Sequence, residues 1–330
     1  GEDDGRAVAR ISLVSGDVSV RLGDGGDWVA AAANAPMVVD DTLATGAGAR
    51  AEIQLDWANL VRAGGDTEVR LAELENERYI LQVARGLVTY RMLRPSQADV
   101  EISTPVVSVR PAGVGSYRIF VRDDGLCEIT VRAGVADVYT ATGSETVRAG
   151  QTMIARGAAS APEFKIAAGV SPDEWDRWND ERDRYYESSQ AYQYVDRSIY
   201  GAEDLDRYGS WSYDDAYGWV WAPAVGQGWA PYYDGRWTWM DWYGWNWVSY
   251  EPWGWAPYHY GRWYYRGGRW CWWPGGFGVR HYWSPGLVAF FGWGDWYGAG
   301  PGYGQIGWIP LAPNEPYYPW FGPGYYGRAR

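Results

Sequence analysis

The chain has 330 residues, enough for two domains with separate cores. Its formal net charge of −12 argues against nucleic acid as a partner, because phosphates require a basic protein surface. No apolar run reaches about 18 residues, so the sequence predicts no membrane span, while association with a membrane surface stays open. Arginine supplies 28 of the 29 basic residues, Lys165 being the exception; codon bias or a need to stack on aromatic rings explains this equally well.

Residues 8–160 have the pattern of short β-strands. Apolar and polar residues alternate in ARAEIQLDW (49–57), GDVSVRL (16–22) and SYRIFV (116–121). This period of two predicts strands with one buried face, which places Ile53 inward and Glu52 outward. Turn signals rich in glycine and aspartate recur about every 8–12 residues. The pattern therefore predicts an all-β sandwich, barrel or solenoid.

Several motifs in residues 103–153 are typical of one family. Thr104-Pro105 precedes a predicted strand, Gly115 precedes an aromatic strand, a glycine turn runs from Val131 to Val135, and Gly150-Gln151 closes the segment. In these features the segment resembles the FecR family, and the resemblance covers most of residues 8–160. The sequence PAGVGSY (111–117) departs from the compact Gly-Thr that relatives carry. The resemblance implies a FecR-like β-sandwich or solenoid for residues 1–160.

FecR proteins are periplasmic sensors that relay a signal from an outer-membrane transporter to a sigma factor. Members with that role carry a cytoplasmic segment and a membrane span, and the printed sequence contains neither. The resemblance is therefore extended to the fold, and FecR-type signalling is kept as an alternative function.

Residues 161–208 are expected to form a linker with one amphipathic helix. Small residues dominate 161–170. Ser171 is the predicted N-cap of a helix that extends to about residue 190, with acidic residues at its positive end. Trp175 and Trp178 begin an aromatic stripe at helical spacing. We expect this helix to dock on a neighbouring domain, and a partner-binding helix is the alternative.

The C-terminal region, residues 209–330, differs sharply in composition. It holds 20 of the 24 tryptophans but only nine Val, Leu and Ile residues. Nine aliphatic side chains cannot form the interior of a region of this size, whereas each aromatic side chain buries about 150–250 Å². We therefore expect indole and phenol rings to form the core.

The same region contains an internal duplication. YGWVWAP (217–223) recurs as YGWNWVS (243–249), and GWAPYYDGRW (228–237) recurs as GWAPYHYGRW (254–263), both at an offset of 26 residues. A weaker third copy, GGRWCWWPG (267–275), is about one residue out of phase. Tryptophans at i and i+2 share one face of a strand, and glycine lets an indole lie flat on the backbone. These features predict repeated β-hairpins, followed by an extended C-terminal tail.

Residues 170–322 also resemble a Trp-rich bacterial envelope domain of unknown function. The segments that carry this resemblance include EDLDRYGSW (203–211) and GWIPLAPNEPYYPWFG (307–322). The resemblance implies an extracytoplasmic location and pairing with a FecR-like domain, and it implies no activity.

No pattern in the sequence predicts a catalytic, cofactor or metal site. The two histidines, His259 and His281, are expected to be structural, since His259 occupies the position of Tyr233 in the first repeat copy. Cys127 and Cys271 form no zinc motif, and they are either one disulfide or two free thiols. Phosphate-binding loops and nucleophile motifs are absent from the sequence.

A glycosidase is the enzyme alternative, for which Glu251 and Glu315 are the candidate carboxylates. We expect both instead to accept hydrogen bonds from indoles, arginines or turn amides.

We expect a non-catalytic extracytoplasmic scaffold or interaction protein that binds protein partners or itself, with its signal peptide removed before Gly1. Exposed Trp, Tyr and Arg residues are typical of interface hot spots. Glycan binding through exposed tryptophans is the second hypothesis. The candidate binding residues are Trp229, Arg236, Trp237, Trp255, Arg262 and Trp263.

Overall fold

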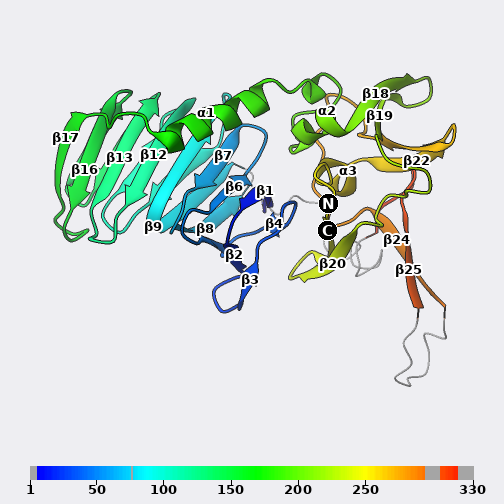
Figure 1. Cartoon of the computed structure of the whole chain (residues 1–330), viewed down its shortest axis with the longest axis horizontal. Helices are drawn as coiled ribbons and strands as arrows, with labels where there is room; N and C mark the ends of the chain where they lie inside the picture. The colour runs from blue at the N-terminus through cyan, green and yellow to red at the C-terminus, as the bar shows by residue number, and fades with distance from the viewer. Residues whose placement is uncertain (1–5, 76, 294–304, 319–330) are drawn as a thin grey trace, which may run out of the picture. The chain divides into compact units, whose positions relative to one another are not determined.

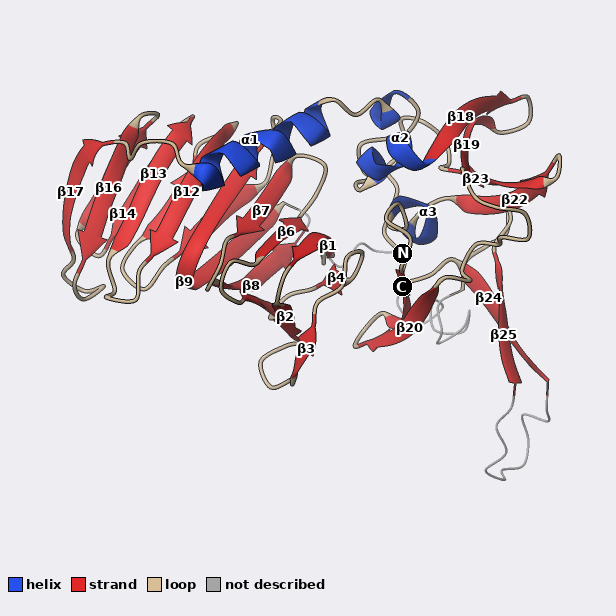
Figure 2. Ribbon diagram, viewed as in Figure 1, coloured by secondary structure: helices blue, strands red, loops and turns tan. Residues whose placement is uncertain are grey.

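The computed structural model describes residues 6–75, 77–293 and 305–318 (Figure 1). The chain forms two compact units: residues 3–188 make up the N-terminal unit, and residues 189–330 with residues 1–2 make up the C-terminal unit. Strands far outnumber helices in both units, so the mainly β fold expected from the sequence is confirmed (Figure 2). The extended tail expected over residues 317–330 lies outside the described residues from residue 319 onward.

Residues 6–75 and 77–188, the described part of the N-terminal unit, form seventeen strands and one helix. Their bounds are β1 Ala9–Ser15, β2 Val18–Arg21, β3 Trp28–Ala30, β4 Pro36–Met37, β5 Thr42–Thr45, β6 Arg50–Gln54, β7 Asn59–Ala63, β8 Glu68–Glu75, β9 Arg78–Met92, β10 Asp99–Ser103, β11 Ser108–Pro111, β12 Gly115–Val121, β13 Cys127–Ala133, β14 Val135–Thr140, β15 Gly143–Arg148, β16 Gln151–Arg156, β17 Glu163–Ala168 and α1 Glu174–Glu187.

The strands form two sheets that share β9 (Figure 1). The order of the first sheet is β3-β2-β5-β8-β9-β10-β11-β14-β15, and that of the second is β4-β1-β6-β7-β9-β12-β13-β16-β17. All neighbours are antiparallel except β9 and β10. Strand β9 crosses from one sheet to the other at Gly86, which has φ of +88° and touches Thr67, so a side chain is excluded there.

The two sheets enclose one aliphatic core. It includes Val20 and Leu71 of the first sheet together with Ile53 and Ile119 of the second. The period of two predicted Val20, Ile53 and Ile119 to face inward, which is correct. Leu22, expected on the same face as Val20, is 51% exposed because it lies beyond the end of β2. Residues 163–168, by contrast, were expected to be linker, but they form β17, which pairs with β16 along its whole length. The alternation Glu163-Phe164-Lys165-Ile166 was the signal of this strand in the sequence.

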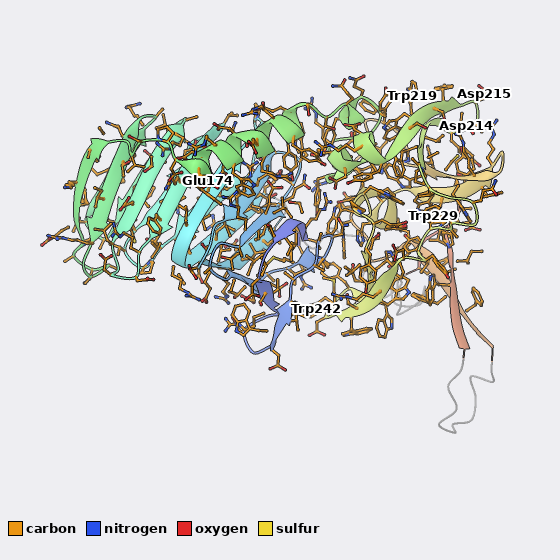
Figure 3. All side chains as sticks on the ribbon, in the orientation of Figure 1. Glu174, Asp214, Asp215, Trp219, Trp229 and Trp242 are labelled. Carbon is orange, nitrogen blue, oxygen red and sulfur yellow. The ribbon has the colours of Figure 1, made fainter. Side chains whose placement is uncertain are left out.

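Helix α1 starts at Glu174 (Figure 3) and lies across the outer face of the second sheet. Its N-cap is Asp173, not Ser171 as the sequence predicted. Asp173 and Asp176 each accept the other's backbone N–H at 3.1 Å, which makes a capping box. Arg118 of β12 and Arg132 of β13 bind the carboxylates of these aspartates, which fixes the start of the helix.

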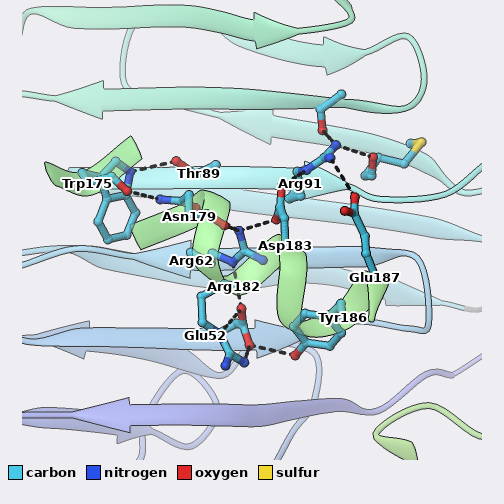
Figure 4. A network of polar contacts seen from close by, with 12 residues as sticks. Glu52, Arg62, Thr89, Arg91, Trp175, Asn179, Arg182, Asp183, Tyr186 and Glu187 are labelled. Atoms are coloured by element: carbon cyan, nitrogen blue, oxygen red, sulfur yellow. Dashed lines mark hydrogen bonds and ion pairs between the residues drawn. The ribbon is translucent and has the colours of Figure 1, made fainter. Parts of the chain in front are cut away.

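A buried ion network joins α1 to the sheet (Figure 4). The Glu52 carboxylate accepts hydrogen bonds from Arg62 at 2.8 Å, Arg182 at 2.5 Å and the Tyr186 hydroxyl at 2.7 Å. Burial would raise the pKa of Glu52, but Arg182 and Arg62 outweigh it and hold that pKa well below its usual range. The expectation that Glu52 faces outward into solvent is wrong, because α1 covers that face of β6.

The helix therefore docks on a sheet of its own unit. Arg62 and Arg91, from adjacent strands, both bind Asp183 of the helix, at 2.7 and 2.5 Å. Trp175 packs beneath the helix and donates its indole N–H to Thr89 at 2.8 Å. The arginines of the sheet thus hold a charged helix over a charged sheet face.

In the C-terminal unit, the described residues form four hairpins and several short helical turns. Their bounds are η1 Ala191–Gln193, η2 Ala202–Asp204, α2 Leu205–Tyr208, β18 Gly209–Asp214, β19 Gly218–Pro223, β20 Gly235–Met240, β21 Gly244–Ser249, α3 Ala256–His259, β22 Arg262–Arg266, β23 Arg269–Trp273, β24 Val288–Trp293 and β25 Gln305–Pro310. The hairpins β18–β19 and β22–β23 join into one sheet through the pairing of Trp221 with Trp272.

The duplication in the sequence corresponds to whole hairpins. Trp263 of β22 follows Trp237 of β20 by 26 residues, but Trp272 follows Trp247 by only 25. The shift arises because a two-residue turn, residues 267–268, replaces the three-residue turn 241–243. The third copy, residues 267–275, therefore forms the shorter turn and the second strand of the hairpin β22–β23, which explains its phase in the sequence.

Aromatic rings form the interior of this unit. The largest side chains buried almost completely are tryptophans and tyrosines: Trp221, Trp247, Trp255, Trp263, Trp272, Tyr232, Tyr258 and Tyr260. Their polar atoms bond mainly to backbone carbonyls, as in the indole N–H of Trp263 to Pro257 O at 2.8 Å and of Trp272 to Tyr260 O at 2.8 Å. The aromatic core expected from the lack of aliphatic residues is present.

Candidate binding surface of the C-terminal unit

The first three hairpins carry aromatic pairs at equivalent positions. In each hairpin an inner cross-strand pair of tryptophans lies nearer the open end: Trp211 with Trp221, Trp237 with Trp247, and Trp263 with Trp272. An outer pair follows two residues nearer the turn: Tyr213 with Trp219, Trp239 with Trp245, and Tyr265 with Trp270. Both pairs lie on the same face of their hairpin, because residues i and i+2 of a strand point the same way.

Burial divides the two kinds of pair. In each inner pair, the tryptophan of the second strand is buried. The three outer pairs meet edge to face, with ring centroids 5.7, 5.6 and 5.5 Å apart and interplanar angles of 86°, 80° and 70°. Five of their six side chains are exposed, and Trp270 is half-buried. The turn end of each hairpin therefore presents a preformed pair of aromatic rings.

The hairpin β20–β21 exposes the most indole surface. Trp242 occupies its turn with φ of +72° and is 76% exposed (Figure 3). Trp239 and Trp245 are 44% and 47% exposed, and Trp239 donates its indole N–H to Asp241 at 3.1 Å. We call Trp239, Trp242 and Trp245 the tryptophan tip.

The candidate residues chosen from the sequence fall into different environments. Trp255 and Trp263 are buried, so neither ring is available for contact with a partner. Trp229 and Trp237 are half-buried: Trp229 packs on Trp263 at 5.6 Å, and the Trp237 ring packs inside the unit. The two arginines of the set differ in exposure. Arg236 is exposed, and Arg262 is half-buried at the edge of a cleft.

The outer tryptophans Trp219, Trp239 and Trp245 were missed as candidates, although the sequence contains their signal. In every i and i+2 pair of a hairpin, the tryptophan nearer the turn is more exposed than its neighbour. Distance from the turn, rather than the face of the strand, separates exposed from buried indoles.

The Glu251 carboxylate is bound by hydrogen-bond donors of the fold itself. Its carboxylate accepts the indole N–H of Trp229 at 2.6 Å and hydrogen bonds from Ser249 and Tyr258. Burial raises the pKa of Glu251 above its usual value. The other candidate carboxylate, Glu315, is exposed and accepts the backbone N–H of Ala312 at 2.7 Å. These contacts confirm that both carboxylates accept hydrogen bonds from protein donors.

His259, Cys127 and Cys271 are also buried within the fold. His259 is fully buried, stacks on Trp283 and lies 2.8 Å from Ser284 O through Nδ1. Cys127 and Cys271 are buried free thiols. Among the residues that the structure describes, no group of three or more His, Cys, Asp or Glu side chains could hold a metal ion. No helix within residues 6–75, 77–293 and 305–318 is long and apolar enough to cross a membrane.

The family comparison concerns the hairpin region. Residues 202–315 match the model of a family described as a family of unknown function (DUF6600). The match spans all four hairpins and agrees with the expected Trp-rich domain. No curated protein matches the chain.

Two crystal structures of a protein from Parabacteroides distasonis ATCC 8503, provisionally assigned as an anti-sigma factor, are similar to part of the chain. The TM-scores are 0.34 and 0.35 at 15% identity, and each alignment covers 39% of this chain. The chain spans 59% of the length of that protein as crystallised.

Proposed function

We propose that the protein is a non-catalytic extracytoplasmic interaction protein whose hairpin tips bind other proteins or further copies of this chain. The observation that carries the proposal is the recurrence of an edge-to-face aromatic pair at the turn end of three hairpins, with five of the six rings exposed. Aromatic residues are enriched at hot spots because a rigid ring buries much area at little cost in conformational entropy.

The tryptophan tip is the strongest of the three sites. Its three indoles stand on a hairpin whose inner rings, Trp237 and Trp247, are packed into the unit at a centroid distance of 5.2 Å. A rigid base holds the exposed rings in place before a partner arrives, which lowers the entropic cost of binding. Asp241 lies in the turn of the same hairpin and supplies a polar group for a rim around the aromatic contact.

The experiment measures self-association by light scattering coupled to size exclusion, over a wide concentration range. The test variant replaces Trp239, Trp242 and Trp245 with serine. The matched control replaces Tyr233, which is 83% exposed and lies outside the strands. We expect oligomers for the wild type and the control and a smaller species for the tip variant. A wild type that stays monomeric at every concentration contradicts self-association, and unchanged assembly of the tip variant contradicts the role of the tip.

FecR-type signalling remains the alternative function for the N-terminal unit, through its sequence resemblance. It requires a cytoplasmic segment joined through a membrane span. The gene sequence upstream of Gly1 tests it, because a signal peptide alone at that place excludes such a sensor.

A further inference from the structure

A cleft opens in the C-terminal unit beside Arg262, away from the outer aromatic pairs. Its volume is about 570 Å³, within the range of small-molecule sites, about 300–1,000 Å³. Three segments form its walls: residues 260–262, residues 273–287 and the turn at residues 314–317. The cleft therefore lies between the start of the third hairpin and the chain that leads into and out of the fourth.

Within the described part of the chain, the Arg262 guanidinium donates hydrogen bonds only to backbone carbonyls. Its Nε and Nη2 atoms donate to the backbone oxygen of Glu315 at 3.1 Å each, and its Nη1 atom donates to Gly261 O at 2.8 Å. Among the described residues no carboxylate lies within ion-pair distance of this guanidinium. Burial lowers the pKa of Arg262, which reflects the loss of water around the charge. An anion in the cleft would compensate that loss.

Other basic groups face the same space. The guanidinium of Arg280 lies over the ring of Tyr282, 5.5 Å from its centroid, and His281 is held by Gly276 O, 2.9 Å from Nε2. One acidic side chain, Glu315, lines the cleft, and it accepts the N–H of Ala312. Basic side chains thus outnumber acidic ones in the lining, although the whole chain is acidic.

The remaining lining suits a sugar better than an apolar ligand or a plain ion. Trp273, Tyr282 and Tyr317 offer aromatic surface, whose negative ring faces attract the C–H groups of a sugar ring. Gly275 and Gly276 bring backbone peptide groups to the surface, where hydroxyl groups can bond to them. Leu287, Pro274 and Pro316 supply the remaining apolar side chains of the lining.

We propose that this cleft binds an acidic saccharide, with Arg262 binding the carboxylate of a uronic acid and Trp273 and Tyr282 packing against sugar rings. Arginine presents a planar fork that matches a carboxylate, which a neutral sugar lacks. The site is separate from the tryptophan tip, so either proposal can fail without the other.

The experiment titrates the full chain with oligogalacturonates of defined length and with their methyl esters, which keep the sugar rings but remove the charge. Binding is followed by calorimetry and by tryptophan fluorescence. The variants are Arg262→Gln, Arg262→Lys and the matched control Arg236→Gln, which changes the equivalent arginine of the preceding repeat outside the cleft. We expect methyl esterification and Arg262→Gln each to weaken binding about tenfold to a hundredfold, as loss of a charge-assisted hydrogen bond does.

Arg236→Gln should bind as the wild type does, and Arg262→Lys should keep part of the affinity. Near-ultraviolet circular dichroism reports whether Arg262→Gln remains folded; if it does not, Arg280→Gln and the ester comparison carry the test. Three results would overturn the proposal: equal binding of acid and ester, no binding of oligogalacturonate or oligoglucuronate, or displacement by polyglutamate at equal concentration. The last result would assign the cleft to acidic peptides.

Discussion

Gly235 lies directly against the indole of Trp247, so that a Cβ on the glycine would stand 2.5 Å from Cζ2 of the tryptophan. The same relationship links Gly209 with Trp221 and Gly261 with Trp272 in the other two hairpins. The first strand of each hairpin thus starts at a glycine or directly after one, because the indole from the second strand occupies the space of a side chain. The Gly-x-Trp pattern of the sequence reflects this contact between a glycine and an indole, which occurs in all three hairpins.

We expect Gly235→Ala to destabilise the C-terminal unit. The added methyl group would also stand 2.6 Å from Val248 O, so either the backbone or Trp247 must move. Overpacking of this kind costs about 1–3 kcal/mol. Urea unfolding followed by tryptophan fluorescence measures the loss. Gly226→Ala is the control, since nothing lies within 4 Å of that position, and its effect should stay below about 1 kcal/mol. Equal effects of the two substitutions would contradict the packing argument.

Substitution of Glu52 should strongly destabilise the N-terminal unit. Glu52→Gln removes the fully buried carboxylate that Arg62 and Arg182 share, and leaves the fully buried Arg62 with Asp183 as its remaining ion-pair partner among the described residues. Removing one partner of a buried pair costs about 3–5 kcal/mol. Denaturant unfolding followed by far-ultraviolet circular dichroism measures this cost.

The control for that prediction is Glu174→Gln. Glu174 is 80% exposed and pairs with Arg50 at 3.1 Å on the surface of the same unit. An exposed pair contributes about 0–1 kcal/mol, so this variant should be close to the wild type. If Glu52→Gln proves as mild as the control, the network is not a principal contact between α1 and the sheet.

The contacts at the N-terminus of α1 predict that the free energy of unfolding depends on pH. Burial opposes ionisation of Asp173, but hydrogen bonds from Arg118 and from the N–H of Asp176 outweigh it and lower its pKa from 3.8 to about 2. A carboxyl group with a depressed folded-state pKa contributes stability above about pH 4, and this contribution disappears as the pH falls toward 2. Asp173→Asn keeps an N-cap acceptor and removes the charge.

The variant should therefore lose less unfolding free energy than the wild type between pH 4 and pH 2. Chemical unfolding of both proteins at a series of pH values gives the two slopes. Identical slopes would mean that the charge of Asp173 makes no favourable contact in the folded state.

The sequence predicted the hairpins because their pattern is local. A fixed offset of 26 residues and tryptophans at i and i+2 are sufficient to define a repeated strand pair, and the lack of aliphatic residues required an aromatic core. Which indoles are exposed could not be predicted from the period alone. Trp245 and Trp247 share one face of β21, yet only the residue nearer the turn is exposed.

The environment of Glu52 and the start of α1 depend on contacts between distant segments. Glu52 alternates with apolar neighbours, which is typical of an exposed position, and the helix that buries it lies 130 residues further along the chain at Arg182. Ser171 and Asp173 are both good N-cap residues, and Arg118 of β12 favours Asp173. A local sequence pattern does not indicate that α1 buries Glu52 or that Arg118 binds the N-cap.

The two cysteines give a prediction that decides between the alternatives left open by the sequence. Cys127 and Cys271 are free and buried, and burial raises the pKa of each thiol, so little thiolate is present at neutral pH. We expect slow alkylation of the folded protein and rapid addition of two labels in urea without reductant, counted by mass spectrometry. Two labels that appear only after reduction would mean a disulfide. Because the cysteines belong to different units, such a bond would also tie the two units together, and its absence leaves the thiols as small apolar side chains in their two cores.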